Sequence, residues 1–173
     1  EAMFAVISSA SIACGGHAGD IASMREAVDR ARRFGVAIGA HPSYVDRAGF
    51  GRFAPPTTPA DLRAQVRGQL ELLVAGGADL AYIKPHGALY HRVTDDRQTA
   101  DAVTDAIAEV SERVGRALPV LGLDGFVADA ASARGLPFFR EAFLDRGYLT
   151  SGALVPRTQA GALLDDPAAV AAR

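Results

Sequence analysis

The sequence predicts an α/β fold built around a parallel sheet, and two observations lead to this prediction. Short apolar segments alternate along the chain with longer amphipathic segments. The short segments are apolar at successive positions rather than at every second one, which is typical of strands covered on both faces. Strands of this kind belong to parallel sheets flanked by helices.

Five segments have the composition of strands, because they are short and rich in apolar residues. They cover residues 5–13, 36–40, 81–84, 118–123 and 137–143.

Four helices are predicted between these strands, because their apolar residues recur every three or four positions. The second helix has a clear start signal, with Thr58 as a cap, Pro59 in the first turn and an early acid. The helices extend from Ile21 to a stop at Gly35, from Thr58 through Leu73, from Ala100 to a stop at Gly115, and over 125–134.

Two architectures fit this alternation: an open, doubly wound sheet, or part of a (β/α) barrel. A complete eight-fold barrel usually takes about 250 residues, and this chain has 173. A barrel would therefore be incomplete or distorted here, and the pattern by itself favours the open sheet.

The composition excludes several classes of protein. Hydrophobic residues make up 49% of the chain and charged residues 22%, as in globular proteins rather than disordered ones. No apolar segment approaches the roughly 18 residues of a membrane span. The net charge of −2 provides no basic surface for nucleic acid or anionic lipid.

We expect a single domain over residues 1–173. The single cysteine, Cys14, excludes an internal disulfide and suits a reducing cytoplasm. No secretory signal precedes the first strand. The chain begins at Glu1 rather than methionine, so we expect further residues upstream.

Unusual residues cluster after the carboxyl ends of the first three predicted strands. His17, His41 and His86 each follow a strand by a few residues, and Lys84, the one lysine among eighteen basic residues, lies beside His86. These strand ends meet at one edge of a parallel sheet, where ligands bind. We therefore expect the three histidines to share a functional site.

The chemistry of such a site has two interpretations. Three neutral imidazoles could hold a divalent metal, or they could act as acid, base and electrophile without one. Taken singly, each histidine is more often a structural residue that bonds to a loop carbonyl. The spacing does not match a motif that places two metal ligands on one helix or strand.

The loops around these histidines contain further candidates. Gly15 and Gly16 allow close approach of an anion, and Asp20 is more simply a helix N-cap than a catalytic group. Arg47 and Arg52 could hold an anionic substrate through paired hydrogen bonds. Cys14 is expected to be a small buried residue rather than a nucleophile.

Several motifs resemble the LamB/YcsF family of 5-oxoprolinase A subunits. They are SIACGGHAGD (11–20), GVAIGAHPSYVDRAGFGR (35–52), KPHGALYH (84–91), EAFLDRGYL (141–149) and LVPR (154–157). The match covers nearly the whole chain in the family's order.

This resemblance implies a distorted (β/α) barrel similar to that of polysaccharide deacetylases, in place of the open sheet. It also implies ATP-dependent opening of 5-oxoproline to L-glutamate by a complex with two other subunits, PxpB and PxpC. The family's N-terminal motif DLNxDxGE and its C-terminal strands are absent here, so an incomplete barrel is expected.

Under this interpretation the amide oxygen is phosphorylated by ATP before water attacks. His41 or His86 would then be the general base, with His17 as a further catalytic candidate. Lys84 and the Gly15–Gly16 amides would stabilise negative charge. Substrate binding would fall to Asp20, Arg47, Arg52 and Tyr90.

Two alternatives of other classes remain. One is a metal-dependent amidase or deacetylase that works without ATP. The other is a non-catalytic subunit that carries substrate to its partners.

Overall fold

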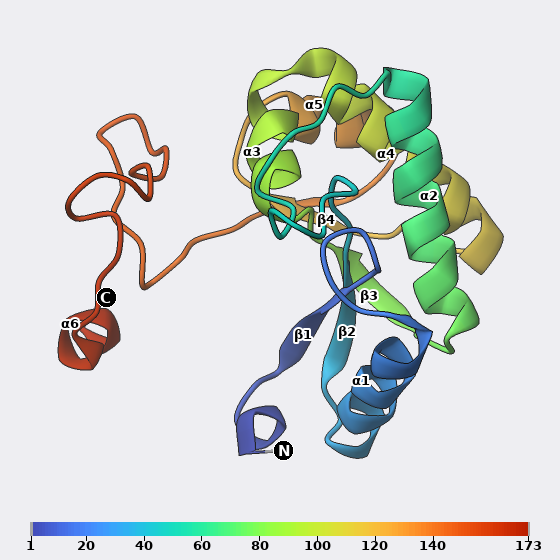
Figure 1. Ribbon diagram of the computed structural model, residues 1–173, viewed down its shortest axis with the longest axis horizontal. Helices are drawn as coiled ribbons and strands as arrows, with labels where there is room; N and C mark the ends of the chain where they lie inside the picture. The colour runs from blue at the N-terminus through green and yellow to red at the C-terminus, as the bar shows by residue number, and fades with distance from the viewer. Residues whose placement is uncertain (1, 173) are drawn as a thin grey trace. The chain divides into compact units, whose positions relative to one another are not determined.

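The computed structural model describes residues 2–172, which form two compact units, 2–140 and 141–172. The prediction of one domain over 1–173 stays a prediction. The larger unit contains the whole sheet and the helices that pack on it (Figure 1).

The sheet has five parallel strands in the order β1-β2-β3-β4-β5. This strictly sequential order is that of a (β/α) barrel, since a doubly wound sheet reverses its strand order at a switch point. The sheet is open between β1 and β5, so the structure is an incomplete barrel, as the family resemblance implies. The strands are β1 Ser9–Ala13, β2 Ala37–His41, β3 Leu80–Ile83, β4 Val120–Gly122 and β5 Phe138–Arg140.

Three predicted strands are shorter in the structure, because a strand needs a partner to extend it. The first was expected from residue 5, but Ala2–Ala5 is a 3-10 helix and pairing with β2 starts at Ser9. Strands β4 and β5 pair along only three residues each, Val120–Gly122 with Phe138–Arg140. The expected strands over 118–123 and 137–143 are therefore too long.

The four predicted helices are present, with bounds that differ from the prediction by one to three residues, and α4 begins at Arg97 rather than at Ala100. Thr58 caps the second helix with Pro59 in its first turn, and Gly115 ends the fourth with a left-handed φ of 74°. One helix that periodicity did not define is α3, which Asp96 separates from α4. The helices are α1 Ile21–Arg33, α2 Pro59–Ala75, α3 Gly87–Asp95, α4 Arg97–Val114, α5 Phe126–Ala133 and α6 Pro167–Ala171.

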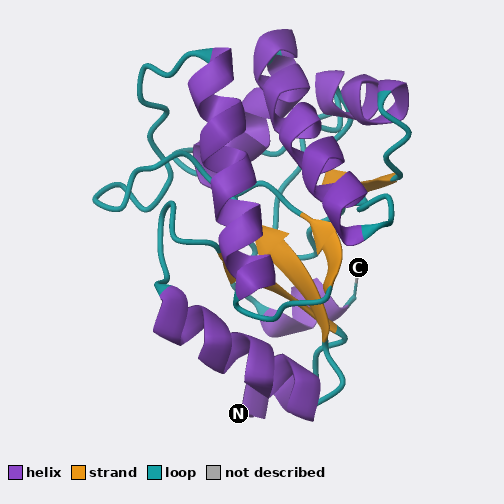
Figure 2. Cartoon of the chain, turned by 90° about the vertical axis from the view of Figure 1, so that its right-hand side faces the viewer, coloured by secondary structure: helices purple, strands orange, loops and turns teal. Residues whose placement is uncertain are grey.

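The core lies between the sheet and the helices that follow its strands. Helices α2 and α4 are the longest and pack side by side (Figure 2). Apolar side chains of the strands and helices are fully buried there, as expected for strands that are apolar at successive positions. They include Ile83, Val120, Val66, Leu70, Leu73, Val103 and Ile107.

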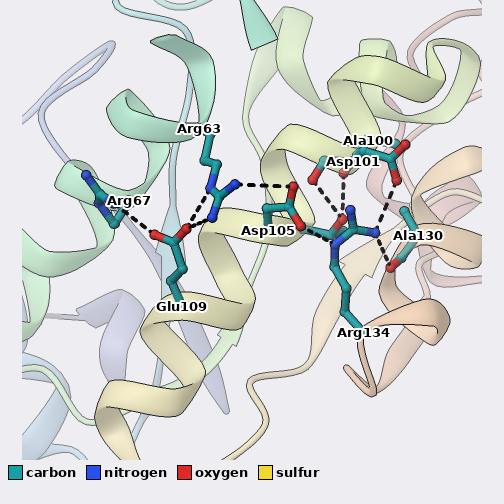
Figure 3. A network of polar contacts seen from close by, with 9 residues as sticks. Arg63, Arg67, Ala100, Asp101, Asp105, Glu109, Ala130 and Arg134 are labelled. Atoms are coloured by element: carbon teal, nitrogen blue, oxygen red, sulfur yellow. Dashed lines mark hydrogen bonds and ion pairs between the residues drawn. The ribbon is translucent and has the colours of Figure 1, made fainter. Parts of the chain in front are cut away.

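A polar network ties three helices together outside this core (Figure 3). Arg63 of α2 bonds to Glu109 of α4, and Arg134 after α5 bonds to Asp101 and Asp105 of α4. These side chains are 20–47% exposed, so each pair adds little stability by itself. The network fixes the packing of the outer helices rather than the site.

The smaller unit is organised around Arg146, which is 5% exposed. Its guanidinium donates hydrogen bonds to the carbonyls of Ala162 and Val155, and two isolated bridges pair Arg146 with Leu163 and Tyr148 with Leu154.

Within residues 2–172, no helix is long and apolar enough to cross a bilayer.

Candidate functional site

The three predicted histidines lie together at the carboxyl edge of β1, β2 and β3. The His17 and His86 rings are stacked, with centroids 3.8 Å apart and planes 14° from parallel. The His41 ring meets them edge-on, 4.8 Å from His86 and 5.7 Å from His17. Parallel strands bring residues 69 positions apart in sequence into contact, as the strand-end argument predicts.

His41 and His86 form a hydrogen-bonded pair between two backbone carbonyls. His41 Nδ1 lies 2.6 Å from the Lys84 oxygen, His41 Nε2 lies 3.0 Å from His86 Nδ1, and His86 Nε2 lies 2.9 Å from the Phe50 oxygen. Carbonyl oxygens only accept hydrogen bonds. All three bonds therefore need three protons, one more than two neutral rings carry.

His17 has a different set of partners. Its Nδ1 lies 2.9 Å from Ser43 Oγ, whose hydroxyl donates to the Tyr44 carbonyl at 2.8 Å. Gln69 holds the Ser43 backbone from both sides: its Oε1 accepts from Ser43 N, and its Nε2 donates to Ser43 O. Ser43 is fully buried and Gln69 is 7% exposed, so this support is rigid.

The loop at Phe50 and Gly51 presses against the ring cluster. Phe50 has a φ of 55°, rare for a bulky residue, and its ring meets His17 and His86 edge-on. Gly51 follows with a φ of 68°, and a Cβ there would lie 2.9 Å from His17 Cβ and from His86 Cδ2. A side chain at position 51 would displace the stack.

The surroundings disfavour protonation of the rings. Burial, followed by the charges of His86 and Arg47, lowers the pKa of His17 to about 4. Burial also lowers the pKa of His41 to about 3. It lowers the pKa of His86 as well, although the hydrogen bond to Phe50 opposes it. Each ring is therefore neutral at pH 7, so His41 and His86 hold only two of the three protons that their three contacts need. The cluster accepts the third proton readily only beside a negative charge.

The three histidines do not fit a metal ion in this arrangement. An ion would need lone pairs converging at about 2.0–2.1 Å, but stacked rings direct theirs along parallel planes. Both nitrogens of His41 and both of His86 already lie within hydrogen-bond distance of a partner. Among residues 2–172, no group of three His, Cys, Asp or Glu side chains could hold a metal.

Two cationic side chains lie near the cluster. The Lys84 ammonium lies 6.0 Å from the centre of the Tyr90 ring, and its charge contributes to the lowered pKa of His41 and of His86. The Arg52 guanidinium lies 5.5 Å from the centre of the Phe50 ring. This edge of the sheet is therefore suited to an anionic ligand.

Some predicted binding residues are occupied by the fold itself. Arg47 Nη1 donates to the carbonyls of Gly15 and Gly19, so it holds the first loop in place. The Gly15 N–H donates to Ala18 within that loop, which removes it from the amides expected to face a ligand. Asp20 is the N-cap of α1 in a capping box with Ser23, as expected.

Gly16 and Cys14 have structural environments. A Cβ on Gly16 would lie 2.5 Å from Gln69 Oε1 and 2.6 Å from Ser43 Oγ, so the loop fits only without a side chain. Cys14 is 1% exposed, and burial raises its pKa to about 12. Its sulfur accepts a hydrogen bond from the His41 N–H. The expectation of a small buried residue at the strand end is confirmed, and an unreactive thiol stays a prediction.

Sequence reasoning missed Ser43 and Gln69. A signal for Gln69 was present, since it lies three residues after Val66 on the apolar face of α2, where a polar side chain needs a buried partner. Ser43 follows His41 by two residues, but no pattern linked it to His17.

Comparison with known proteins places this chain in a family. The LamB/YcsF family model matches residues 1–173. The 5-oxoprolinase A subunit of Streptomyces avermitilis is 47% identical over 178 residues, covering 100% of this chain and 70% of the relative. That of Chloroflexus aggregans is 45% identical, covering 98% and 68%. A lactam utilization protein from Thermus thermophilus, known from its crystal structure, is 39% identical in sequence. The two structures agree with a TM-score of 0.91 over 98% of this chain and 69% of the other.

Proposed function

Because this chain belongs to the LamB/YcsF family, we propose that it is the A subunit of a 5-oxoprolinase. Its substrate would be 5-oxo-L-proline, a five-membered lactam that carries a carboxylate. The solved relative is named for lactam utilization, which supports this substrate class.

The observation that carries the proposal is the neutral histidine cluster near two cationic side chains. Lys84 and Arg52 lie close enough to lower the pKa of His86, and an anionic substrate would offset their charge. The substrate carboxylate would thereby favour proton uptake by the cluster just when a water is to be deprotonated.

We assign the roles of the charged groups accordingly. Arg52, rather than Arg47, would hold the substrate carboxylate, since Arg47 already bonds to two loop carbonyls. Lys84 would stabilise the negative charge that develops on the reacting oxygen, with Tyr90 beneath its ammonium. Asp20 would contribute through the helix start that it caps.

A lactam is a stable amide, so we propose that ATP activates it within a complex with PxpB and PxpC. The γ-phosphoryl group of ATP would pass to the oxygen of the lactam amide. Water would then add to the carbon that bears this oxygen. The carbon–nitrogen bond would then break with a proton passing to nitrogen, leaving an acyl phosphate. A second water would release phosphate and L-glutamate. ATP is a co-substrate of the complex here, with no binding site assigned to this subunit.

We also propose a cytoplasmic location, because the free Cys14 thiol suits a reducing compartment.

The test uses the full-length protein, by itself and reconstituted with its two partner subunits, and follows glutamate release from 5-oxoproline. Release only from the mixture supplied with ATP is the expected result. Turnover by the isolated protein without ATP, abolished by a chelator, would establish the metal-dependent amidase instead. Substrate binding with full turnover in every histidine variant would establish a carrier.

A further inference from the structure

The hydrogen bonds distinguish His17 from the other two histidines. Every ring nitrogen of His41 and His86 faces a carbonyl oxygen or the other ring at 2.6–3.0 Å. Neither ring therefore offers a lone pair to a substrate water without first breaking one of these contacts.

The tautomer of His17 follows from its partner. The Ser43 hydroxyl donates its one proton to the Tyr44 carbonyl, so its oxygen can only accept from His17. His17 Nδ1 must therefore carry the ring proton. In the neutral ring, Nε2 is then left with its lone pair.

This lone pair has access to solvent. His17 Nε2 makes no hydrogen bond within residues 2–172. In that part of the chain, the one fully buried side-chain nitrogen or oxygen without a partner is Gln65 Oε1. His17 is only 4% exposed, so its Nε2 must belong to the small surface that remains.

The support behind His17 has little freedom to move. Gln69 bonds to both backbone groups of Ser43, at 3.0 and 2.8 Å. Gly16 leaves the space that Ser43 Oγ and Gln69 Oε1 fill. The lone pair at Nε2 is thus set by buried contacts made on the opposite side of the ring.

We propose that His17 is the general base of the lactam hydrolysis and that Ser43 is the positioning residue that keeps its Nε2 unprotonated. This inference rests on the proposed function for its reaction. His17 Nε2 takes a proton from the attacking water as the water oxygen bonds to the lactam carbon. Because the amide oxygen is phosphorylated, the double bond of that carbon is to nitrogen, and its π pair moves onto the nitrogen. The proton later passes from His17 to this nitrogen as the carbon–nitrogen bond breaks.

The first test needs no turnover. In the isolated chain with ¹⁵N-labelled histidine, NMR should show His17 at pH 7.5 as a neutral ring protonated at Nδ1, with an unprotonated Nε2. In Ser43→Ala this preference should be lost. A His17 ring protonated at Nε2 in the native chain would overturn the proposal.

The second test measures kcat in the reconstituted complex. His17→Gln should lower kcat by about 10²–10⁴, and Ser43→Ala should lower it by about tenfold. Because Ser43 acts through His17, adding Ser43→Ala to His17→Gln should cause no further loss. A full additional tenfold loss would show that Ser43 is merely structural, and near-normal turnover of His17→Gln would overturn the base assignment.

Ser111→Ala is the matched control, since Ser111 is also a buried serine, whose oxygen accepts from the Leu118 N–H far from the site. It should lower stability about as much as Ser43→Ala and leave kcat unchanged. If the complex releases no glutamate at all, the proposed function fails and the base role fails with it. An Nδ1–H tautomer would then still establish Ser43 as the residue that positions His17.

Discussion

The rings of His17 and His86 lie face to face, 3.8 Å between centroids and 14° from parallel, although the two residues follow different strands. A positive charge on either ring disfavours one on the other, and burial opposes both. Burial, with the neighbouring positive charges as a smaller contribution, therefore keeps both stacked imidazoles neutral. This arrangement has consequences for stability as well as for catalysis.

Acidification below pH 6.5 should destabilise the fold through His17 and His41. Their folded pKa values, about 4 and about 3, lie below the ordinary 6.5, so the unfolded chain binds protons that the native state does not. The stability from each ring is complete above pH 6.5 and declines as the pH falls toward its folded pKa. The slope is at most about 1.4 kcal/mol per pH unit for each ring. Urea unfolding between pH 7.5 and 5 measures this dependence of the unfolding free energy on pH. If the double variant His17→Gln/His41→Gln had the same slope as the native chain, the two histidines would not be its source.

Lys84→Ala should lower kcat of the complex by about 10²–10³, the usual cost of one group that stabilises developing charge. Lys84→Arg should fail too, because the broader guanidinium cannot replace a compact ammonium above Tyr90. Arg97→Ala is the control, since Arg97 pairs with Asp101 on the exposed surface of α4. Near-normal turnover of Lys84→Ala would exclude the proposed role.

Gly51→Ala should destabilise the protein more than Gly35→Ala. Both glycines have a left-handed φ, 68° and 66°, so both substitutions carry a backbone cost of about 1–2 kcal/mol. A Cβ at Gly35 meets no atom within 4 Å, whereas one at Gly51 lies 2.9 Å from His17 and His86. We expect about 1–3 kcal/mol more for Gly51→Ala. Equal urea midpoints for the two variants would show that the loop can move away from the rings.

Cys14 should resist thiol reagents in the native protein at pH 8. Its side chain is 1% exposed and burial raises its pKa to about 12, so almost no thiolate forms. Labelling should become rapid and complete only in denaturant, as a colorimetric thiol assay would show. Cys14→Ala should leave turnover of the complex close to wild type. Rapid native labelling together with an inactive Cys14→Ala would instead indicate a nucleophile.

Much of the fold could be predicted from local patterns. Helix starts such as Thr58–Pro59 and stops such as Gly115 act within one turn of chain, so their effect is visible in the sequence. The ends of the strands are predicted less accurately, because the length of a strand depends on the neighbour with which it pairs. The pairing of β1 with β2 starts at Ser9, opposite Ala37, so β1 is shorter than the strand predicted from residue 5.

The choice between an open sheet and a barrel could not be made from periodicity, since both need the same alternation of strands and helices. The family resemblance chose correctly, and the sequential strand order confirms it. Which residues share the site was predictable for the same topological reason, because parallel strands present their carboxyl ends at one edge. His17, His41 and His86 meet there.

By itself, the sequence determined the order of the elements, the edge at which chemistry gathers and the residue types found there. Only the tertiary structure decided how each of those residues is used. It binds Arg47 to loop carbonyls, pairs His41 with His86, and places Ser43 and Gln69 behind His17. The physical reason is that a hydrogen bond depends on atom positions to a few tenths of an ångström. Residue spacing along a chain specifies the face and the edge but not that geometry.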